Sequence, residues 1–161
     1  MPYTIKISWD GPHKIAAVIE KMKNGGKSPD WNGDDYGVYQ IYGKHIIYGR
    51  NTLLYIGKAT NQTFSTRIKQ HKRWWLDKEE NIEIYLGRIY NRRRHSPKDK
   101  WNSWMKDVKT TEEILLYKYS PNYNSTNIES PPKTNPKKII LIHIRKKNRL
   151  KARDYAPEDF E

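Results

Sequence analysis

Strand-like and helix-like runs alternate along this chain, and their order limits the folds that it can adopt. Residues 3–9 alternate apolar and polar side chains, which is typical of a half-buried strand, and Gly11-Pro12 is expected to end it. Apolar residues at helical spacing predict a helix over 13–23. The Gly, Asn and Asp residues that follow predict a loop over 24–35.

Two runs rich in β-branched and aromatic residues come next, at 36–43 and 51–57, and they predict neighbouring strands. Residues 45–49 between them are expected to form an extra strand or one arm of a hairpin. The pattern then predicts a helix over 64–76, with Phe64, Ile68, Trp75 and Leu76 on one face, and a further strand over 82–90.

The C-terminal part begins with a helix that Ser96 and Pro97 indicate, because serine caps helices and proline favours the first helical position. This helix is expected to run toward Tyr119, with a break near 109–110. The continuous apolar run at 139–144 predicts a buried strand, and a basic tail follows it.

This order predicts an α/β (α+β) fold, with a small mixed or antiparallel sheet flanked by helices. A chain of 161 residues most naturally forms one domain, here residues 1–161. Only 35% of the residues are hydrophobic and 30% are charged, so the core must be lean. The 12 Tyr and six Trp meet that need, because each aromatic ring buries a large area.

The net charge of +13 indicates a polyanionic partner, and nucleic acid is the first candidate. No run is long enough to cross a bilayer, and no basic amphipathic helix stands out, so no membrane partner is expected. The absence of cysteine excludes disulfides and cysteine-bound zinc. The N-terminus lacks the apolar segment of a secretory signal, and we expect a cytoplasmic protein.

Four segments carry side chains suited to cleaving a phosphodiester bond, although each has an ordinary structural explanation when taken alone. A guanidinium such as that of Arg67 matches a phosphate and neutralises the charge that builds on its oxygens. A carboxylate such as Glu112 can hold one divalent cation that stabilises the leaving oxygen. A tyrosine beside a cation can approach the pKa that a general base requires.

Taken in order, these segments resemble the GIY-YIG nuclease superfamily. The sequence GVY at 37–39 is similar to the first half of the family signature, and YIGKA at 55–59 to the second half. TFSTRIKQH at 63–71 resembles the helix that carries the family's arginine. EEILLYKYSPNYN at 112–124 resembles its metal-binding helix and closing asparagine. The resemblance covers 36–124, which is expected to be the catalytic core, with elaborations of the same domain on both sides.

The resemblance implies a role for each residue of the predicted site. Glu112, which the match favours over Glu113, would bind magnesium or manganese. Arg67 would contact the scissile phosphate. Tyr39 and Tyr55 would line the site, and one of them would be the general base, with the choice between them open.

Three further residues complete the predicted site. Lys58 would lower a tyrosine pKa or bind phosphate, His71 would carry protons, and Asn124 would orient its neighbours by hydrogen bonds. The basic residues expected to bind nucleic acid outside the site are Arg92, Arg93, Arg94, Lys69 and Arg73. A solvated charge run explains such residues equally well.

The resemblance thus implies a magnesium- or manganese-dependent endonuclease that acts on nucleic acid, foremost double-stranded DNA. Because the chain leaves no room for a separate DNA-reading domain, a stand-alone restriction or defence enzyme is the form expected. A homodimer is compatible with the sequence. The alternative is a non-catalytic basic nucleic-acid-binding protein that retains the fold.

Overall fold

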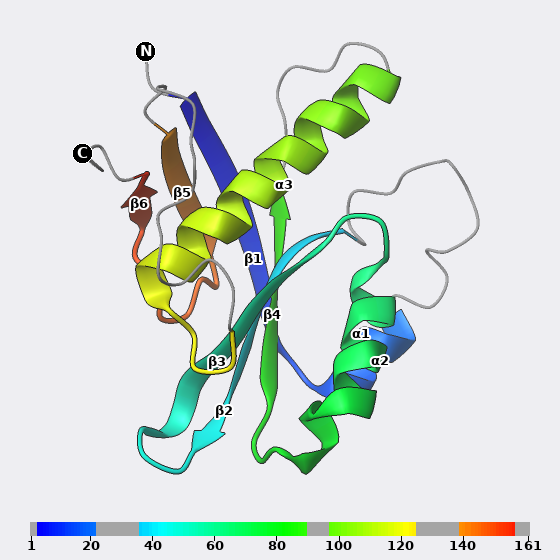
Figure 1. The fold of residues 1–161 in the computed structure, drawn as a ribbon, viewed down its shortest axis with the longest axis vertical. Coiled ribbons are helices and arrows are strands. Elements are labelled where there is room, and N and C mark those ends of the chain that lie inside the picture. The colour runs from blue at the N-terminus through cyan, green and yellow to red at the C-terminus, as the bar shows by residue number, and fades with distance from the viewer. Residues whose placement is uncertain (1–2, 22–35, 90–96, 125–138, 157–161) are drawn as a thin grey trace.

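The computed structural model describes residues 3–21, 36–89, 97–124 and 139–156. They form a six-stranded sheet with helices on both faces (Figure 1). The strands are β1 (Tyr3–His13), β2 (Gly37–His45), β3 (Gly49–Ala59), β4 (Glu83–Ile89), β5 (Ile139–Arg145) and β6 (Arg153–Tyr155). The helices are α1 (Ile15–Lys21), α2 (Phe64–Trp74) and α3 (Pro97–Tyr119), with a short 3-10 turn η2 (Leu76–Lys78).

The strand order in the sheet is β3-β2-β4-β1-β5-β6. Only β1 and β5 pair in parallel among the described strands, so the sheet is mixed. This arrangement confirms the predicted α+β fold class. Residues 46–48 form the turn of the β2–β3 hairpin, and the extra strand considered for 45–49 is absent.

The two faces of the sheet carry separate hydrophobic clusters. Helix α3 packs on one face, where Trp104 and Leu115 are buried with Val38 of β2. Helices α1 and α2 pack on the other, where Val18 and Phe64 are buried. Strand β2 lies inside the sheet with both faces covered, and its first seven residues are all buried for that reason.

Two predicted breaks do not occur. Strand β1 continues beyond the cis Gly11–Pro12 peptide to His13. The register with β4 shifts between Asp10 and His13, so Pro12 does not need to take part in regular pairing. Helix α3 continues through 109–110 without interruption. Burial of residues on both sides of that point, including Val108 and Ile114, holds the helix together despite its two threonines.

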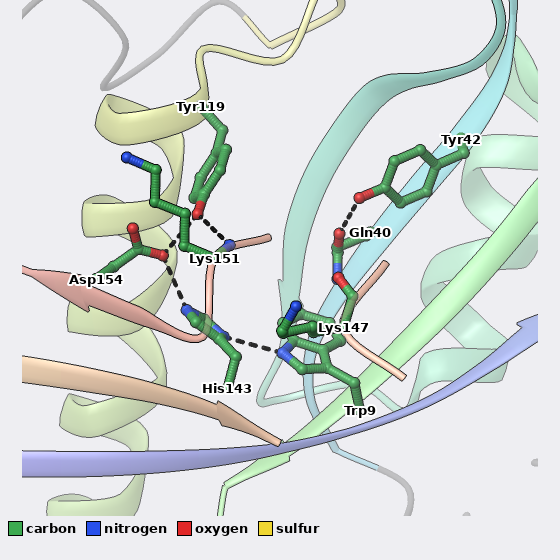
Figure 2. A network of polar contacts seen from close by, with 8 residues as sticks. All are labelled: Trp9, Gln40, Tyr42, Tyr119, His143, Lys147, Lys151 and Asp154. Carbon is green, nitrogen blue, oxygen red and sulfur yellow. Dashed lines mark hydrogen bonds and ion pairs between the residues drawn. The ribbon is translucent and has the colours of Figure 1, made fainter. Parts of the chain in front are cut away.

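The basic tail predicted after β5 returns to the sheet as β6, which pairs antiparallel with β5. A buried polar network holds β6 against the rest of the sheet (Figure 2). Trp9 Nε1 donates to Nδ1 of His143 at 3.0 Å, and Nε2 of His143 lies 3.0 Å from Oδ2 of Asp154. The hydroxyl of Tyr119 donates to the same carboxylate oxygen at 2.8 Å. The network therefore joins β1, β5, β6 and the end of α3.

Candidate active site

The hairpin of β2 and β3 brings two tyrosines together. In its register Tyr39 lies opposite Gly57, and Tyr55 lies opposite Ile41, two positions along β2. The two phenol rings stack with their centroids 6.1 Å apart. Tyr39 is fully buried, whereas Tyr55 reaches the wall of an open cavity. Tyr55 therefore lies at the cavity surface of the site, and Tyr39 lies in the protein interior behind it.

The glycines beside these tyrosines are required by close approach. A Cβ on Gly57 would collide with the hydroxyl of Tyr39, whose ring lies across the glycine. A Cβ on Gly37 would collide with the backbone carbonyl of Gly87 on β4, and its φ of +150° also favours glycine. Each glycine of the two signature segments therefore has a steric reason in this fold.

Helix α2 delivers the positively charged part of the site. Thr63 caps it, since its hydroxyl accepts a hydrogen bond from the backbone N–H of Thr66 at 3.3 Å. Phe64 and Ile68 are fully buried against the sheet, as their shared helical face predicted. Arg67 lies beside that buried face, in the cavity wall.

His71, one turn after Arg67, is buried behind the two tyrosines. Its Nε2 lies 2.7 Å from the hydroxyl of Tyr39, and its Nδ1 accepts the indole N–H of Trp75 at 3.1 Å. Because Nδ1 accepts, the proton of the neutral ring is on Nε2, and that N–H donates to the oxygen of Tyr39. Burial, and then the charge of Arg67, lowers the pKa of His71 to about 4. This arrangement favours a positioning role over the proton-carrying role that the resemblance implies.

Arg67 is itself held in place by Gln70, which Gln62 supports in turn. Its guanidinium donates to Oε1 of Gln70 at 2.6 Å, and Nε2 of Gln70 donates to Oε1 of Gln62 at 3.0 Å. Burial raises the pKa of Tyr55, and the Arg67 charge opposes part of that rise. The pKa of Tyr39 is raised by burial for the same reason. A guanidinium alone therefore does not bring either phenol into the range of a base near neutral pH.

Helix α3 supplies the acidic group from the other face of the sheet. Glu112 is mostly buried, with 14% of its side chain exposed, and its Oε1 lies 3.4 Å from Nζ of Lys58 on β3. Burial raises the pKa of Glu112, and the ammonium of Lys58 opposes that rise. The neighbouring Glu113 instead lies 4.0 Å from Lys109 on the helix surface. The structure thus places Glu112, and not Glu113, in the cavity wall.

Asn124 binds the edge of the sheet just after α3. Its Oδ1 accepts the backbone N–H of Ile56 at 3.0 Å, and its Nδ2 donates to the carbonyl of Ile56 at 2.9 Å. The backbone N–H of Tyr123 donates to the carbonyl of Leu54 at 2.8 Å. Both functional atoms of the Asn124 amide are therefore occupied in holding β3, between Tyr55 and Lys58.

These groups meet in one cavity of about 520 Å³, which is open to solvent. Most of its lining side chains are polar or charged, which suits a polar ligand. The lining residues are Tyr55, Ile56, Lys58, Thr60, Asn61, Gln62, Arg67, Glu112, Leu116 and Asn124. Tyr39 and His71 lie behind Tyr55 and complete the predicted set.

The donor set suits a cation that binds few protein ligands. No group of three or more acidic or histidine side chains suited to a metal occurs in the described ranges. Magnesium keeps several waters and is commonly held by one or two carboxylates together with substrate phosphates. Glu112, mostly buried and lining the cavity, is such a carboxylate, and burial raises its pKa by more than Lys58 and Arg67 lower it.

The predicted nucleic-acid-binding residues fall in two groups. Lys69 and Arg73 are exposed on α2, near the cavity residue Arg67 but outside the cavity. Arg92, Arg93 and Arg94 lie outside the described residues.

Sequence reasoning missed two supports of the site. Trp75 was predicted only as part of the apolar face of α2, although its place four residues after His71 was a visible signal. Gln70 follows Arg67 by three residues, and the same helical spacing indicated their contact.

Comparisons of this chain with protein-family models, curated proteins and solved structures find no match in any of the three. The described part of the chain contains no helix long and apolar enough to span a membrane. The functional assignment therefore rests on the residues of the site and their geometry.

Proposed function

We propose that this protein is a divalent-metal-dependent endonuclease of the GIY-YIG type, which hydrolyses phosphodiester bonds in DNA. One observation carries the proposal. The cavity joins Arg67 of α2, Glu112 of α3, and Tyr55 and Lys58 of β3, which are the four kinds of group that such a reaction uses. The net charge of +13 supports a polyanionic substrate.

In this proposal Arg67 binds the non-bridging oxygens of the scissile phosphate. Gln70 fixes the guanidinium in advance, so that little reorganisation is needed as negative charge builds in the transition state. Glu112 would hold a magnesium or manganese ion, which when bound polarises the phosphate and stabilises the leaving oxygen. Lys58, now 3.4 Å from Glu112, would turn to the phosphate when a cation takes the carboxylate.

We assign the general base to Tyr55 rather than Tyr39. Tyr55 lines the cavity and can reach a water there, whereas Tyr39 is fully buried behind it. Burial and the Glu112 carboxylate raise the pKa of Tyr55, while Arg67 and the hydroxyl of Tyr39 offset part of that rise. The positive charge of the bound cation would lower it further. Tyr39, held by His71, would position the phenol and not react itself.

The second function considered is binding of nucleic acid without cleavage. Burying Glu112 costs free energy that binding alone does not repay, since a carboxylate repels phosphates. A protein that only binds has no reason to keep such a group beside Arg67 in the same cavity. The acidic side chain therefore favours catalysis over binding alone.

The test compares Glu112→Gln with the matched variant Glu113→Gln. Supercoiled plasmid, linear duplex, single-stranded DNA and RNA would be incubated with magnesium, manganese or EDTA. We expect metal-dependent cleavage of DNA by the wild type and by Glu113→Gln. Glu112→Gln should be inactive, while its affinity for DNA in EDTA stays within a few-fold of wild type.

Two results would contradict the proposal. Full activity in both variants would remove Glu112 from the site. Tight binding of DNA by a wild-type protein that cleaves none of the four substrates under any metal condition would favour the non-catalytic alternative. A restriction or defence role remains part of the proposal, on the resemblance alone.

A further inference from the structure

A continuous row of aromatic rings leads from the cavity to the tip of the β2–β3 hairpin. It consists of Tyr55, Trp75, Tyr123, His45 and Tyr48, and we call it the aromatic strip. Successive ring centroids lie 6.0, 5.3, 6.3 and 5.0 Å apart. Tyr55 lies seven positions after Tyr48, which corresponds to a length of about 23 Å at 3.3 Å per residue of extended chain.

The outer rings of the strip are open to solvent. Tyr48 is 67% exposed and Tyr123 is 40% exposed, which is unusual for large aromatic side chains. Beside Tyr48, Ile46 and Ile47 at the hairpin tip are also exposed. Exposed rings and branched apolar side chains in one place indicate a surface that a partner covers.

The rings are also held in fixed positions. Nδ1 of His45 accepts the backbone N–H groups of Ile47 and Tyr48 at 3.1 and 3.3 Å, and the ring of Tyr48 stacks on His45. The backbone of Tyr123 is bonded to β3, and its hydroxyl donates to Glu79. Binding a flat ligand on such rings costs little conformational entropy.

The strip runs along the outer edge of β3. In Figure 1 the segment after α3 lies beside β3, above the hairpin turn. Tyr123 belongs to this segment and directly precedes Asn124 in the cavity wall. The strip therefore begins at the cavity, with Tyr55, and passes the segment that ends at Asn124 in the cavity wall.

Charges of both signs lie beside the strip. Glu79 accepts a hydrogen bond from Tyr123 and keeps its negative charge, whereas Glu80 forms an ion pair with Lys44 at 3.5 Å. Arg50 is exposed just after the hairpin turn. Together with Lys58 and Arg67 at the other end, basic side chains lie at both ends of the strip.

We infer that the aromatic strip binds a single-stranded segment of DNA, whose unpaired bases stack on Tyr123 and Tyr48 along the path that leads away from the scissile phosphate. Stacking requires exposed base faces, and a paired duplex hides them within its own stack. The inference rests on the proposed nuclease function for the position of the scissile phosphate. It narrows the substrate from double-stranded DNA to DNA with an unpaired strand that extends from the cut along the strip.

The experiment measures binding and stacking separately, in EDTA at one salt concentration. Fluorescence anisotropy would compare a single-stranded oligonucleotide with the same sequence as a duplex, and a 2-aminopurine base in the single strand would report stacking. The variants are Tyr48→Leu and Tyr123→Leu, which keep apolar area but lose the flat ring. Tyr155→Leu is the control, because Tyr155 is 44% exposed on β6, at the other end of the sheet.

Each strip variant should lose about tenfold in affinity for the single strand and should no longer quench 2-aminopurine. Its affinity for the duplex should change less than about twofold, since the phosphate contacts that dominate duplex binding remain. Tyr155→Leu should behave as wild type with both probes.

Wild-type affinity in both strip variants would overturn the inference, as would an equal loss on duplex and single strand. A change in sedimenting mass of Tyr48→Leu without DNA would also overturn it, by showing that the strip joins two copies of the chain. The cleavage assay of the wild-type protein tests the nuclease proposal separately from this binding experiment. Ring-dependent binding without any cleavage would support the strip and refute the nuclease.

Discussion

The indole N–H of Trp75 donates to Nδ1 of His71 at 3.1 Å, and this contact decides which nitrogen of His71 carries the proton. The N–H on Nε2 then donates to the oxygen of Tyr39, 2.7 Å away. A side chain outside the cavity therefore controls the polarity of the hydrogen bonds behind the proposed base, Tyr55.

Replacing Trp75 with phenylalanine should preserve the ring packing but remove the hydrogen bond that fixes the tautomer of His71. Nδ1 of His71 could then be protonated, and Nε2 would accept from Tyr39 in place of donating to it. We expect the single-turnover cleavage rate to fall about ten- to a hundredfold, as when an orienting partner of a reactive side chain is lost. Nitrogen NMR shifts of the His71 ring should show the altered tautomer.

Trp74→Phe is the matched control, because Trp74 is 62% exposed and meets the His71 ring edge-on, whereas the hydrogen bond to Nδ1 of His71 comes from Trp75. It should retain both the wild-type rate and the wild-type tautomer. A normal rate in Trp75→Phe together with a changed tautomer would show that the orientation of His71 is irrelevant to cleavage.

The lowered pKa of His71 predicts a loss of stability in mild acid. The pKa is about 4 in the folded protein and 6.5 without perturbation, so the unfolded chain binds more protons between these values. The stabilisation is therefore complete above about pH 6.5 and declines as the pH falls toward 4. At pH 5 the loss should be about 2 kcal/mol relative to pH 8.

Urea unfolding of wild type and His71→Gln at pH 8 and pH 5 isolates this contribution. Other groups titrate in both proteins, so the difference between their free energies of unfolding should shrink by the predicted amount at pH 5. An unchanged difference at the two pH values would show that His71 is protonated as easily in the fold as outside it.

Arg67→Lys should be almost as inactive as Arg67→Ala. Lysine keeps the positive charge but loses the planar fork that contacts Gln70 and would contact two phosphate oxygens. Loss of one such preorganised donor costs about a hundred- to a thousandfold in rate. The measurement is single-turnover cleavage at saturating enzyme, with Arg153→Lys, exposed on β6 at the far end of the sheet, as the control. Cleavage within a few-fold of wild type by both Arg67 variants would exclude Arg67 from the active site.

Asp154→Ala should destabilise the fold without touching the cavity. Asp154 is buried and accepts hydrogen bonds from His143 and Tyr119, and both donors would be left without that acceptor (Figure 2). The expected cost is about 3 kcal/mol in the free energy of unfolding. Urea unfolding measures this change in the free energy of unfolding. The control is Asp77→Ala at an exposed position of η2, which should change stability by less than about 0.5 kcal/mol. An equal, small effect of both substitutions would show that the network does not hold β6.

Local sequence patterns were sufficient to predict most of the helices and strands. Alternation predicted β1 and β4, β-branched and aromatic runs predicted β2 and β3, and apolar spacing predicted the docking of Phe64 and Ile68. The ends were less well predicted, because β1 passes Gly11–Pro12 and α3 passes 109–110 where pairing and packing outweigh local preference. Strand β6 was missed, since three residues carry no readable period.

The sequence by itself determined which side chains could serve the proposed chemistry, because residue type and order along the chain are local information. Only the tertiary structure decided that Tyr55 faces the cavity and Tyr39 does not, and that Trp75 sets the tautomer of His71. The aromatic strip likewise unites residues from β2, β3 and the segment after α3. Such contacts depend on the order and register of the strands and on which helix covers each face. These are long-range consequences of burying the core, and no local periodicity encodes them.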